Sequence, residues 1–297
     1  MSDSTPPDSS HPEPPAPPAP PERIAQLLAK EARSLSMHHE DALSHSLSPF
    51  RVGSVGYLNA VPLTRGLEND VIFATPAQLA GMLQRHELDA ALVSASEVLL
   101  HDRYDVLDGI SVSSLGEVKS VFLAHRGPIE SVRRIHCDPA SLTSVNLLRV
   151  LLAERGLTPE FQPLESYDHQ TLPDHTLLIG DPAIDFLRSP HDRQIWDLGQ
   201  AWHEMTRLPF VYAVWALRRG IDFQRLGILL RSAKAFGLET LDTIIRTRRD
   251  YDEAFRRDYL GWHIHYHLGA DEKAGLKRFA DLLEKHGLGP VYPTSFV

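Results

Sequence analysis

Three hydroxyl side chains lie close together in the segment Asp138–Ser144, at the point where a helix is expected to begin. Ser141, Thr143 and Ser144 would stand beside the backbone N–H groups that the first turn of a helix leaves unpaired. Such N–H groups, together with the positive end of the helix dipole, bind carboxylates and phosphates. The segment is therefore the best candidate anion site in the chain, and simple capping of the helix by each hydroxyl is the alternative.

A second pair of polar side chains follows the first apolar stretch of the chain, RVGSVGYLNAVPL (51–63). Val52 and Val55 are β-branched and predict a buried strand that ends in a polar turn. Tyr57 and Asn59 would then lie on a loop just past the carboxyl end of a strand, which is where open α/β sheets bind small molecules. The alternative is a first core strand followed by an ordinary Asn turn.

The sixteen histidines raise the question of a metal site, chiefly in WHIHYH (262–267). His263, His265 and His267 would share one face on a strand, whereas on a helix only His263 and His267 would do so. Because no Asp, Glu or Cys nearby completes a recognisable ligand set, we predict no metal site. The sequence also contains neither a G-x-x-x-x-G-K-[ST] phosphate loop nor a G-x-S-x-G hydrolase elbow.

The composition of the chain argues against several classes of protein. With 297 residues, 42% of them hydrophobic and 23% charged, it is typical of a soluble globular protein. A formal net charge of -9 argues against nucleic acid as a partner, because phosphate binding needs concentrated Lys and Arg. The longest apolar run, 208–217, is far shorter than the roughly 20 residues of a membrane-spanning helix. The single cysteine, Cys137, excludes an intrachain disulfide and fits a reducing, cytoplasmic compartment.

The first 50 residues differ in composition from the rest of the chain. Residues 1–21 hold nine prolines among Ser, Asp, Glu and Ala, which predicts a disordered or polyproline-like segment. This segment lacks the basic start, apolar core and small-residue cleavage site of a signal peptide. Apolar residues at helical spacing predict a short amphipathic helix over 23–35. The organised sequence begins close to Met37, and we hypothesise that much of the first 36 residues is dispensable or outside the natural reading frame.

From residue 51 the chain alternates short apolar segments with helical patterns. Thr75 and Pro76 mark the clearest helix start, an N-cap followed by Pro in the first helical position. This alternation favours two α/β lobes with a ligand between them. We expect residues 51–123 to form the first part of lobe 1, 124–213 to form lobe 2, and 214–297 to return to lobe 1 with C-terminal helices. The predicted strands are 71–73, 90–93, 109–112, 118–124, 135–137, 160–162, 177–179, 195–198 and 210–217, and the predicted helices are 76–85, 145–155, 224–238 and 272–286.

Several segments, taken in order, resemble the menaquinone biosynthesis family that contains chorismate dehydratase, an enzyme of the futalosine route. They are RVGSVGYLNAVPL, LVSASEVLL, GEVKSVFLA, SLTSVNLLRVLL, LLIGDPAI and DLGQAWHEMTRLPFVYAVWA. Together they cover residues 51–219, while the helical tail with YLGWHIHYHLG fits less sharply. The resemblance implies a two-lobed type II periplasmic-binding-protein-like fold of the α/β class with a central cleft, used inside the cell as an enzyme.

The resemblance also implies an activity and residues for it. Chorismate dehydratase removes water from chorismate to give 3-[(1-carboxyvinyl)oxy]benzoate, without a metal or organic cofactor. In this family the Asn of the YLN-like motif is important for catalysis, which maps to Asn59, and a Ser of the G-x-V-x-S segment lies at the substrate, which maps to Ser120. The S-x-T-S helix start, here Ser141, Thr143 and Ser144, is similar to the site of the substrate carboxylate.

Five further positions bear on this expected site. Tyr57 and Asp181 are included among the substrate-binding candidates, although Asp181, like Glu97, could instead bond backbone groups at a strand end. Leu142 stands where the family often has Arg, so a positive charge near the anion site is missing or comes from elsewhere, with Arg207 as a candidate. Arg207 itself stands where the family's T-G-L-P-F has glycine.

Two other functions are compatible with the same fold. One is the sibling enzyme that makes 1,4-dihydroxy-6-naphthoate, and the other is a non-catalytic solute-binding protein for small anions, because fold does not determine function. The YLNA opening favours the dehydratase, and a solute-binding protein would normally carry an export signal. We expect the partner to be a small-molecule substrate, with no nucleic acid and no membrane.

Overall fold

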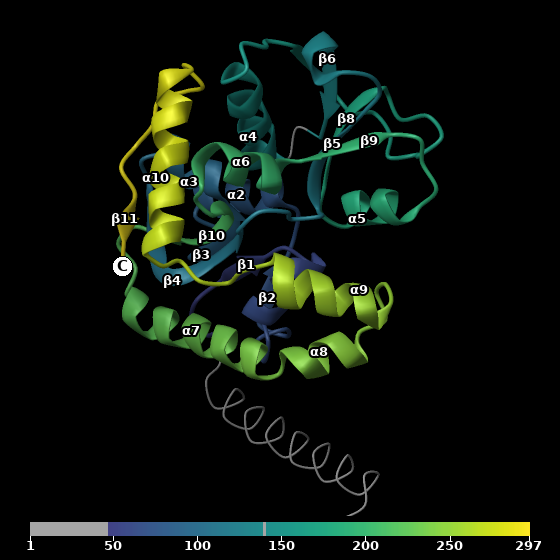
Figure 1. Cartoon of the computed structure of the whole chain (residues 1–297). Helices are drawn as coiled ribbons and strands as arrows, with labels where there is room; N and C mark the ends of the chain where they lie inside the picture. Colours follow the sequence, from purple (N-terminus) through teal and green to yellow (C-terminus); the bar gives the residue numbers. More distant parts are fainter. Residues whose placement is uncertain (1–46, 139–140) are drawn as a thin grey trace, which may run out of the picture.

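A computed structural model describes residues 47–138 and 141–297, which form two α/β lobes, each built on its own sheet (Figure 1). The predictions for the N-terminal extension, including the helix over 23–35 and the start near Met37, lie outside the described residues. Within the part that is described, no helix has the length and hydrophobicity that a membrane span needs.

Lobe 1 is built on a six-stranded mixed sheet. Parallel pairing joins β1 to β2 and β3, whereas β10 runs antiparallel to both β3 and β4. Because β10 inserts between β3 and β4, the chain must return from lobe 2 to complete the sheet of lobe 1. The order of the strands is β11 (Ser295–Phe296), β4 (Tyr104–Ser114), β10 (Phe210–Arg218), β3 (Ala90–Ser94), β1 (Val52–Ser54) and β2 (Val71–Phe73).

Lobe 2 is built on a five-stranded sheet. Its central strand β8 pairs parallel with β6 and antiparallel with β5, and β5 continues to the antiparallel edge strand β9. The order of the strands is β7 (Glu160–Pro163), β6 (Arg134–Cys137), β8 (His175–Ile179), β5 (Val121–His125) and β9 (Gln194–Asp197).

Helices cover both sheets. In Figure 1, α7, α8 and α9 follow one another below the sheet of lobe 1, and α10 rises beside β11. Three short helical segments interrupt the loops, of which η1 and η2 are 3₁₀-helices and η3 is a π-helix. The bounds are η1 (Leu58–Leu63), α2 (Pro76–Gln84), α3 (Ala95–Leu100), η2 (Ile129–Ser131), α4 (Leu142–Ala153), α5 (Gly180–Arg188), α6 (Leu198–Thr206), α7 (Phe223–Glu239), α8 (Leu241–Thr247), α9 (Glu253–Asp258), η3 (Tyr259–His263) and α10 (Ala270–Lys285).

The start of α2 shows how local sequence determines an element. Thr75 accepts a hydrogen bond from the backbone of Gln78, and the side chain of Gln78 bonds back to the N-cap, so a complete capping box precedes the helix. The helix then packs directly on β1. A Cβ added at Gly53 of β1 would lie only 2.5 Å from Leu79 Cδ2 of α2, which shows how closely the two elements approach. The predicted helix start at Pro76 is confirmed.

The chain passes between the lobes twice. Residues 115–120 connect β4 of the first sheet to β5 of the second, and residues 207–209 lead from α6 back to β10. The predicted divisions fall after residues 123 and 213. Ion pairs across the lobes add to the two connections, with Glu154, the C-cap residue of α4, lying 2.6 Å from Lys285 of α10 and Arg188 of α5 paired with Asp252 at the start of α9.

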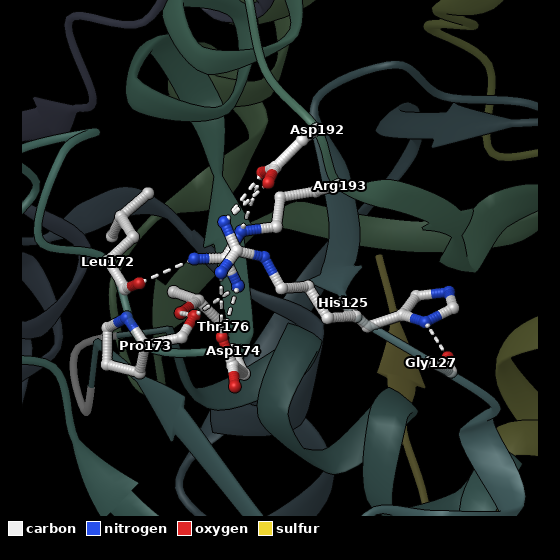
Figure 2. A network of polar contacts seen from close by, with 9 residues as sticks. His125, Gly127, Leu172, Pro173, Asp174, Thr176, Asp192 and Arg193 are labelled. Carbon is white, nitrogen blue, oxygen red and sulfur yellow. Dashed lines mark hydrogen bonds and ion pairs between the residues drawn. The ribbon is translucent and has the colours of Figure 1, made fainter.

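The far end of lobe 2 is held together by a nearly buried arginine. The guanidinium of Arg193 donates to the carbonyl oxygens of Leu172 at 2.7 Å and Pro173 at 3.0 Å, and it also contacts Asp174 and Asp192 (Figure 2). Arg193 therefore ties the loop before β8 to the start of β9. This network lies at the opposite end of β5 and β8 from the connection to lobe 1.

Candidate functional site

A cavity between the lobes is lined by residues of both. Apolar side chains such as Val55, Leu92 and Ile179 form part of its wall. The predicted site residues come together here with one exception, Asp181, which is not part of the lining. The polar side chains of the lining are Tyr57, Asn59, Ser94, Ser120, Ser141, Thr143, Ser144 and Tyr212.

Tyr57 and Asn59 lie in a tighter structure than the predicted loop. Tyr57 is the N-cap residue of η1, and Asn59 lies in the first turn of this 3₁₀-helix. Helix α7 packs against η1 so closely that a Cβ at Gly237 would lie 1.9 Å from the carbonyl oxygen of Pro62. Only glycine permits this approach of the two backbones, and the contact holds Asn59 at the cavity wall.

The side chain of Tyr57 extends from lobe 1 to lobe 2. Its ring packs over Gly180, where an added Cβ would lie 3.5 Å from the ring carbons. Burial raises the pKa of Tyr57, and the negative charges of Asp138 and Asp181 raise it further. The hydroxyl therefore stays protonated near neutral pH and can act as a hydrogen-bond donor in the cavity.

Ser120 is positioned by a half-buried carboxylate at the first lobe crossing. Asp197 accepts hydrogen bonds from the backbone nitrogens of Lys119 at 2.8 Å, Val118 at 3.1 Å and Gln200 at 2.9 Å. Burial raises the pKa of Asp197, and these three hydrogen bonds oppose that shift. Lys119 adopts a left-handed backbone with φ of 62°, so the chain turns sharply just before Ser120 and β5 begins only at Val121.

The predicted hydroxyls at the start of α4 differ in their hydrogen bonding. Thr143 Oγ1 accepts a hydrogen bond of 2.8 Å from the backbone nitrogen of Ser96, at the start of α3 in lobe 1. Ser141 is the N-cap residue, yet its side chain makes no capping bond, and in the described part of the chain nothing hydrogen-bonds its buried Oγ. Ser141 is 4% exposed and Ser144 is 6% exposed. Because burying an unpaired hydroxyl costs free energy, Ser141 is the hydroxyl best suited to receive a ligand.

The two carboxylates at motif positions both interact with protein groups. Burial raises the pKa of the Asp181 carboxyl, and its interaction with the backbone N–H of Leu58, the residue before Asn59, opposes that shift. Glu97 is buried inside lobe 1, where it accepts hydrogen bonds from Tyr104 at 2.8 Å and Gln84 at 3.0 Å.

No Lys or Arg is found among the described residues that line the cavity. Leu142, at the position where the resemblance predicts a positive charge, forms part of the lining. Arg207, the candidate replacement, is an exposed residue at the C-terminal end of α6 and is not part of the lining. Its φ of 61° is a left-handed backbone conformation that glycine adopts without strain.

Sequence reasoning missed two tyrosines at the cavity. Tyr212 on β10 lies in the lining, and its hydroxyl is 3.1 Å from Ser114 Oγ. Tyr259, the buried first residue of η3, donates a hydrogen bond of 2.8 Å to Ser120 Oγ. No local signal marks Tyr259, because its partner lies far away in the sequence.

The three histidines of WHIHYH contact different partners. His263 Nδ1 lies 2.8 Å from the carbonyl oxygen of Glu117, whereas His267 Nδ1 lies 3.1 Å from Lys234 Nζ. The backbone of His265 pairs with Ser113 of β4. Across residues 47–138 and 141–297, no group of three or more His, Cys, Asp or Glu side chains is arranged to hold a metal ion.

Two α/β lobes that are joined by two crossings and enclose a cavity define a periplasmic-binding-protein-like fold. The crystal structure of the periplasmic aliphatic sulphonate binding protein of Escherichia coli matches with a TM-score of 0.53 at 13% sequence identity, over 84% of this chain and 93% of that one. A crystal structure of a protein from Archaeoglobus fulgidus matches with a TM-score of 0.65 at 20% identity, over 80% of this chain and 98% of that one. At these identities the likeness concerns the fold alone.

Sequence comparison then identifies the family. The family profile described as menaquinone biosynthesis matches residues 50–285. The chain is also 34% identical to the chorismate dehydratase of Thermus thermophilus over 261 residues, which cover 80% of this chain and 96% of the relative. The protein belongs to the menaquinone biosynthesis family.

Proposed function

We propose that this protein is a chorismate dehydratase, a carbon–oxygen lyase that converts chorismate to 3-[(1-carboxyvinyl)oxy]benzoate in the futalosine route. The family membership and the identity to the Thermus enzyme support this assignment. The structural observation that carries it is the meeting of Asn59, Ser120 and the unpartnered Ser141 in one cavity between the lobes.

The substrate is a dianion, and the cavity offers neutral hydrogen-bond donors for its carboxylates. The ring carboxylate would lie at the start of α4, where Ser141 and Ser144 supply hydroxyls and the first turn supplies N–H groups. Ser120 donates to the same carboxylate from the lobe crossing, and the phenol of Tyr57 adds a further donor. The donors come from both lobes, so binding of the substrate would hold the lobes together.

Removal of water from chorismate makes the ring aromatic, so the product is strongly favoured and the enzyme needs chiefly to orient the reacting groups. Asn59 cannot act as the base, because a neutral amide has no useful proton affinity near neutral pH. The enolpyruvyl carboxylate of the substrate takes the proton from C3, and the electrons of that C–H bond form the new ring double bond. The C–O bond at C4 breaks, and the leaving hydroxyl takes this proton from the enolpyruvyl carboxyl group and departs as water. Asn59 holds the enolpyruvyl carboxylate in the direction that this transfer requires.

The proposed reaction uses only protein groups and the substrate. The gain of aromaticity supplies the driving force, so no metal or organic cofactor is part of the proposal. A cytoplasmic location also belongs to it, supported by the single buried cysteine, Cys137, which suits a reducing compartment.

The direct test is incubation of the purified protein with chorismate, followed by mass spectrometry. We expect a product that has lost one water and shows the ultraviolet absorption of a substituted benzoate. A solute-binding protein would return chorismate unchanged while binding it, so calorimetric titration with chorismate distinguishes that alternative. Failure of both turnover and binding would overturn the assignment.

A further inference from the structure

Tyr259 lies behind the wall of the interlobe cavity, where α9 ends and the π-helix η3 begins. It is 1% exposed, and its ring stacks on Phe255 with centroids 5.5 Å apart and an angle of 14° between the planes. A π-helix is a rare, widened turn that occurs frequently at functional sites. Figure 1 shows α9, which leads into this turn, on the side of lobe 1 that faces α5 of lobe 2, and the ion pair between Arg188 and Asp252 joins the same two helices.

The hydrogen bond of Tyr259 has a defined direction. A phenol has a single proton, and Tyr259 donates it to Ser120 Oγ over 2.8 Å. Burial raises the pKa of Tyr259 well above its ordinary value, so the phenol keeps its proton throughout the neutral range.

This direction determines what the cavity receives from Ser120. Because Ser120 Oγ accepts from Tyr259, its own proton is left to donate to a group in the cavity. A buried hydroxyl from the C-terminal part of the chain thus orients a side chain at the first lobe crossing.

We propose that Tyr259 is a positioning residue that sets the direction of the hydrogen bond from Ser120 to the substrate. It does not line the cavity and acts only through Ser120. The inference rests on the proposed dehydration of chorismate, in which Ser120 serves as a donor to a carboxylate. Tyr259 extends the site by a residue from the C-terminal part of the chain.

The test is Tyr259→Phe, which removes the hydroxyl and keeps the ring that stacks on Phe255. We expect kcat with chorismate to fall about 10- to 100-fold, because the ring is oriented less well when the proton of Ser120 is no longer directed. KM should change less, since the hydroxyls of Ser141 and Ser144 and the N–H groups at the start of α4 still bind the ring carboxylate. Tyr266→Phe is the matched control, since Tyr266 is 3% exposed and its hydroxyl has no hydrogen-bond partner in the described part of the chain. Its kcat should equal that of the wild type.

A double variant separates positioning from a merely structural role. If Tyr259 acts through Ser120, the combination of Tyr259→Phe with Ser120→Ala should lose less than the product of the two single losses. Unfolding midpoints in urea show whether each variant is folded. If Tyr259→Phe does not fold, 3-fluorotyrosine at position 259 provides a second test, because it keeps the ring and the hydroxyl but makes the phenol more acidic. This replacement should change kcat, whereas the same replacement at position 266 should leave kcat unchanged.

The outcomes distinguish this inference from the assignment it rests on. A wild-type kcat in Tyr259→Phe, equal losses in the two Phe variants, or fully multiplicative losses in the double variant would overturn the role of Tyr259 alone. A wild-type protein that neither dehydrates nor binds chorismate would overturn the proposed function and this role with it.

Discussion

Thr143 Oγ1 of lobe 2 lies 2.8 Å from the backbone nitrogen of Ser96 in lobe 1, and this hydrogen bond caps α3 from the opposite lobe. Asn146 strengthens the contact, with its amide nitrogen 3.4 Å from Ser96 Oγ. Thr143 is therefore part of the joint between the lobes as well as of the cavity lining.

Thr143→Val should weaken this joint, because valine has the same shape but leaves the buried N–H of Ser96 without an acceptor. We expect the free energy of unfolding to fall by about 1–3 kcal/mol. Urea denaturation measures the change, and Thr143→Ser, which keeps the acceptor, should be much closer to the wild type. Equal stability of the Val and Ser variants would show that the hydrogen bond contributes little.

Asn59→Asp should abolish most of the dehydration of chorismate. The new carboxylate would face a dianionic substrate in a cavity whose described lining contains no Lys or Arg, and we expect kcat/KM to fall at least about 100-fold. Measurement of kcat and KM with chorismate provides the test, with circular dichroism as the control for folding. Normal turnover by this variant would contradict the role proposed for Asn59.

Acidification should destabilise the protein in part through His267. The positive charge of Lys234, whose Nζ lies 3.1 Å from His267 Nδ1, and burial both lower the pKa of His267 below its usual 6.5. Since the unfolded state binds the proton more readily, the stabilising contribution is present above pH 6.5 and is lost as the pH falls through the folded-state pKa.

Urea midpoints measured from pH 8 down to about pH 5 would show this effect. His267→Asn keeps an acceptor for Lys234 but cannot be protonated, so its stability should fall less on acidification than that of the wild type. An identical pH dependence of the two proteins would exclude a contribution from His267.

Arg207→Gly should stabilise the protein. Arg207 has φ of 61° at the end of α6, a conformation that is strained for residues with a Cβ. We expect a gain of about 0.5–1 kcal/mol in the free energy of unfolding, with unchanged kcat because Arg207 does not line the cavity. Arg207→Ala keeps the Cβ and should show no such gain, which separates backbone strain from loss of the charge.

Much of the fold follows from patterns that are local in the sequence. The capping box at Thr75 and Gln78 determines the start of α2, and the apolar run at 210–217 corresponds to β10 (Phe210–Arg218). The periodic segment 272–286 forms α10 (Ala270–Lys285). Each of these signals depends on residues within one element, so a single sequence is enough to reveal it.

The local details at the cavity follow from contacts that a sequence does not display. The predicted strand 118–124 begins only at Val121, because Lys119 turns to direct its backbone N–H at Asp197. The predicted loop at Asn59 is the 3₁₀-helix η1, which is packed closely by the α7 backbone at Gly237. Tyr259 reaches Ser120 across 139 positions of the chain. Such long-range pairs depend on how the two lobes meet.

The absence of Lys and Arg from the described lining of the cavity has a consequence for how fast the substrate arrives. The whole chain carries a formal net charge of -9, so a dianion approaching from solution meets a repelling field, and the described lining of the cavity holds no Lys or Arg to attract it. Dissolved salt shortens the reach of that field to about 10 Å at 0.1 M. The association rate should therefore rise with ionic strength, the reverse of the behaviour of anion-binding proteins that attract their ligands with basic residues.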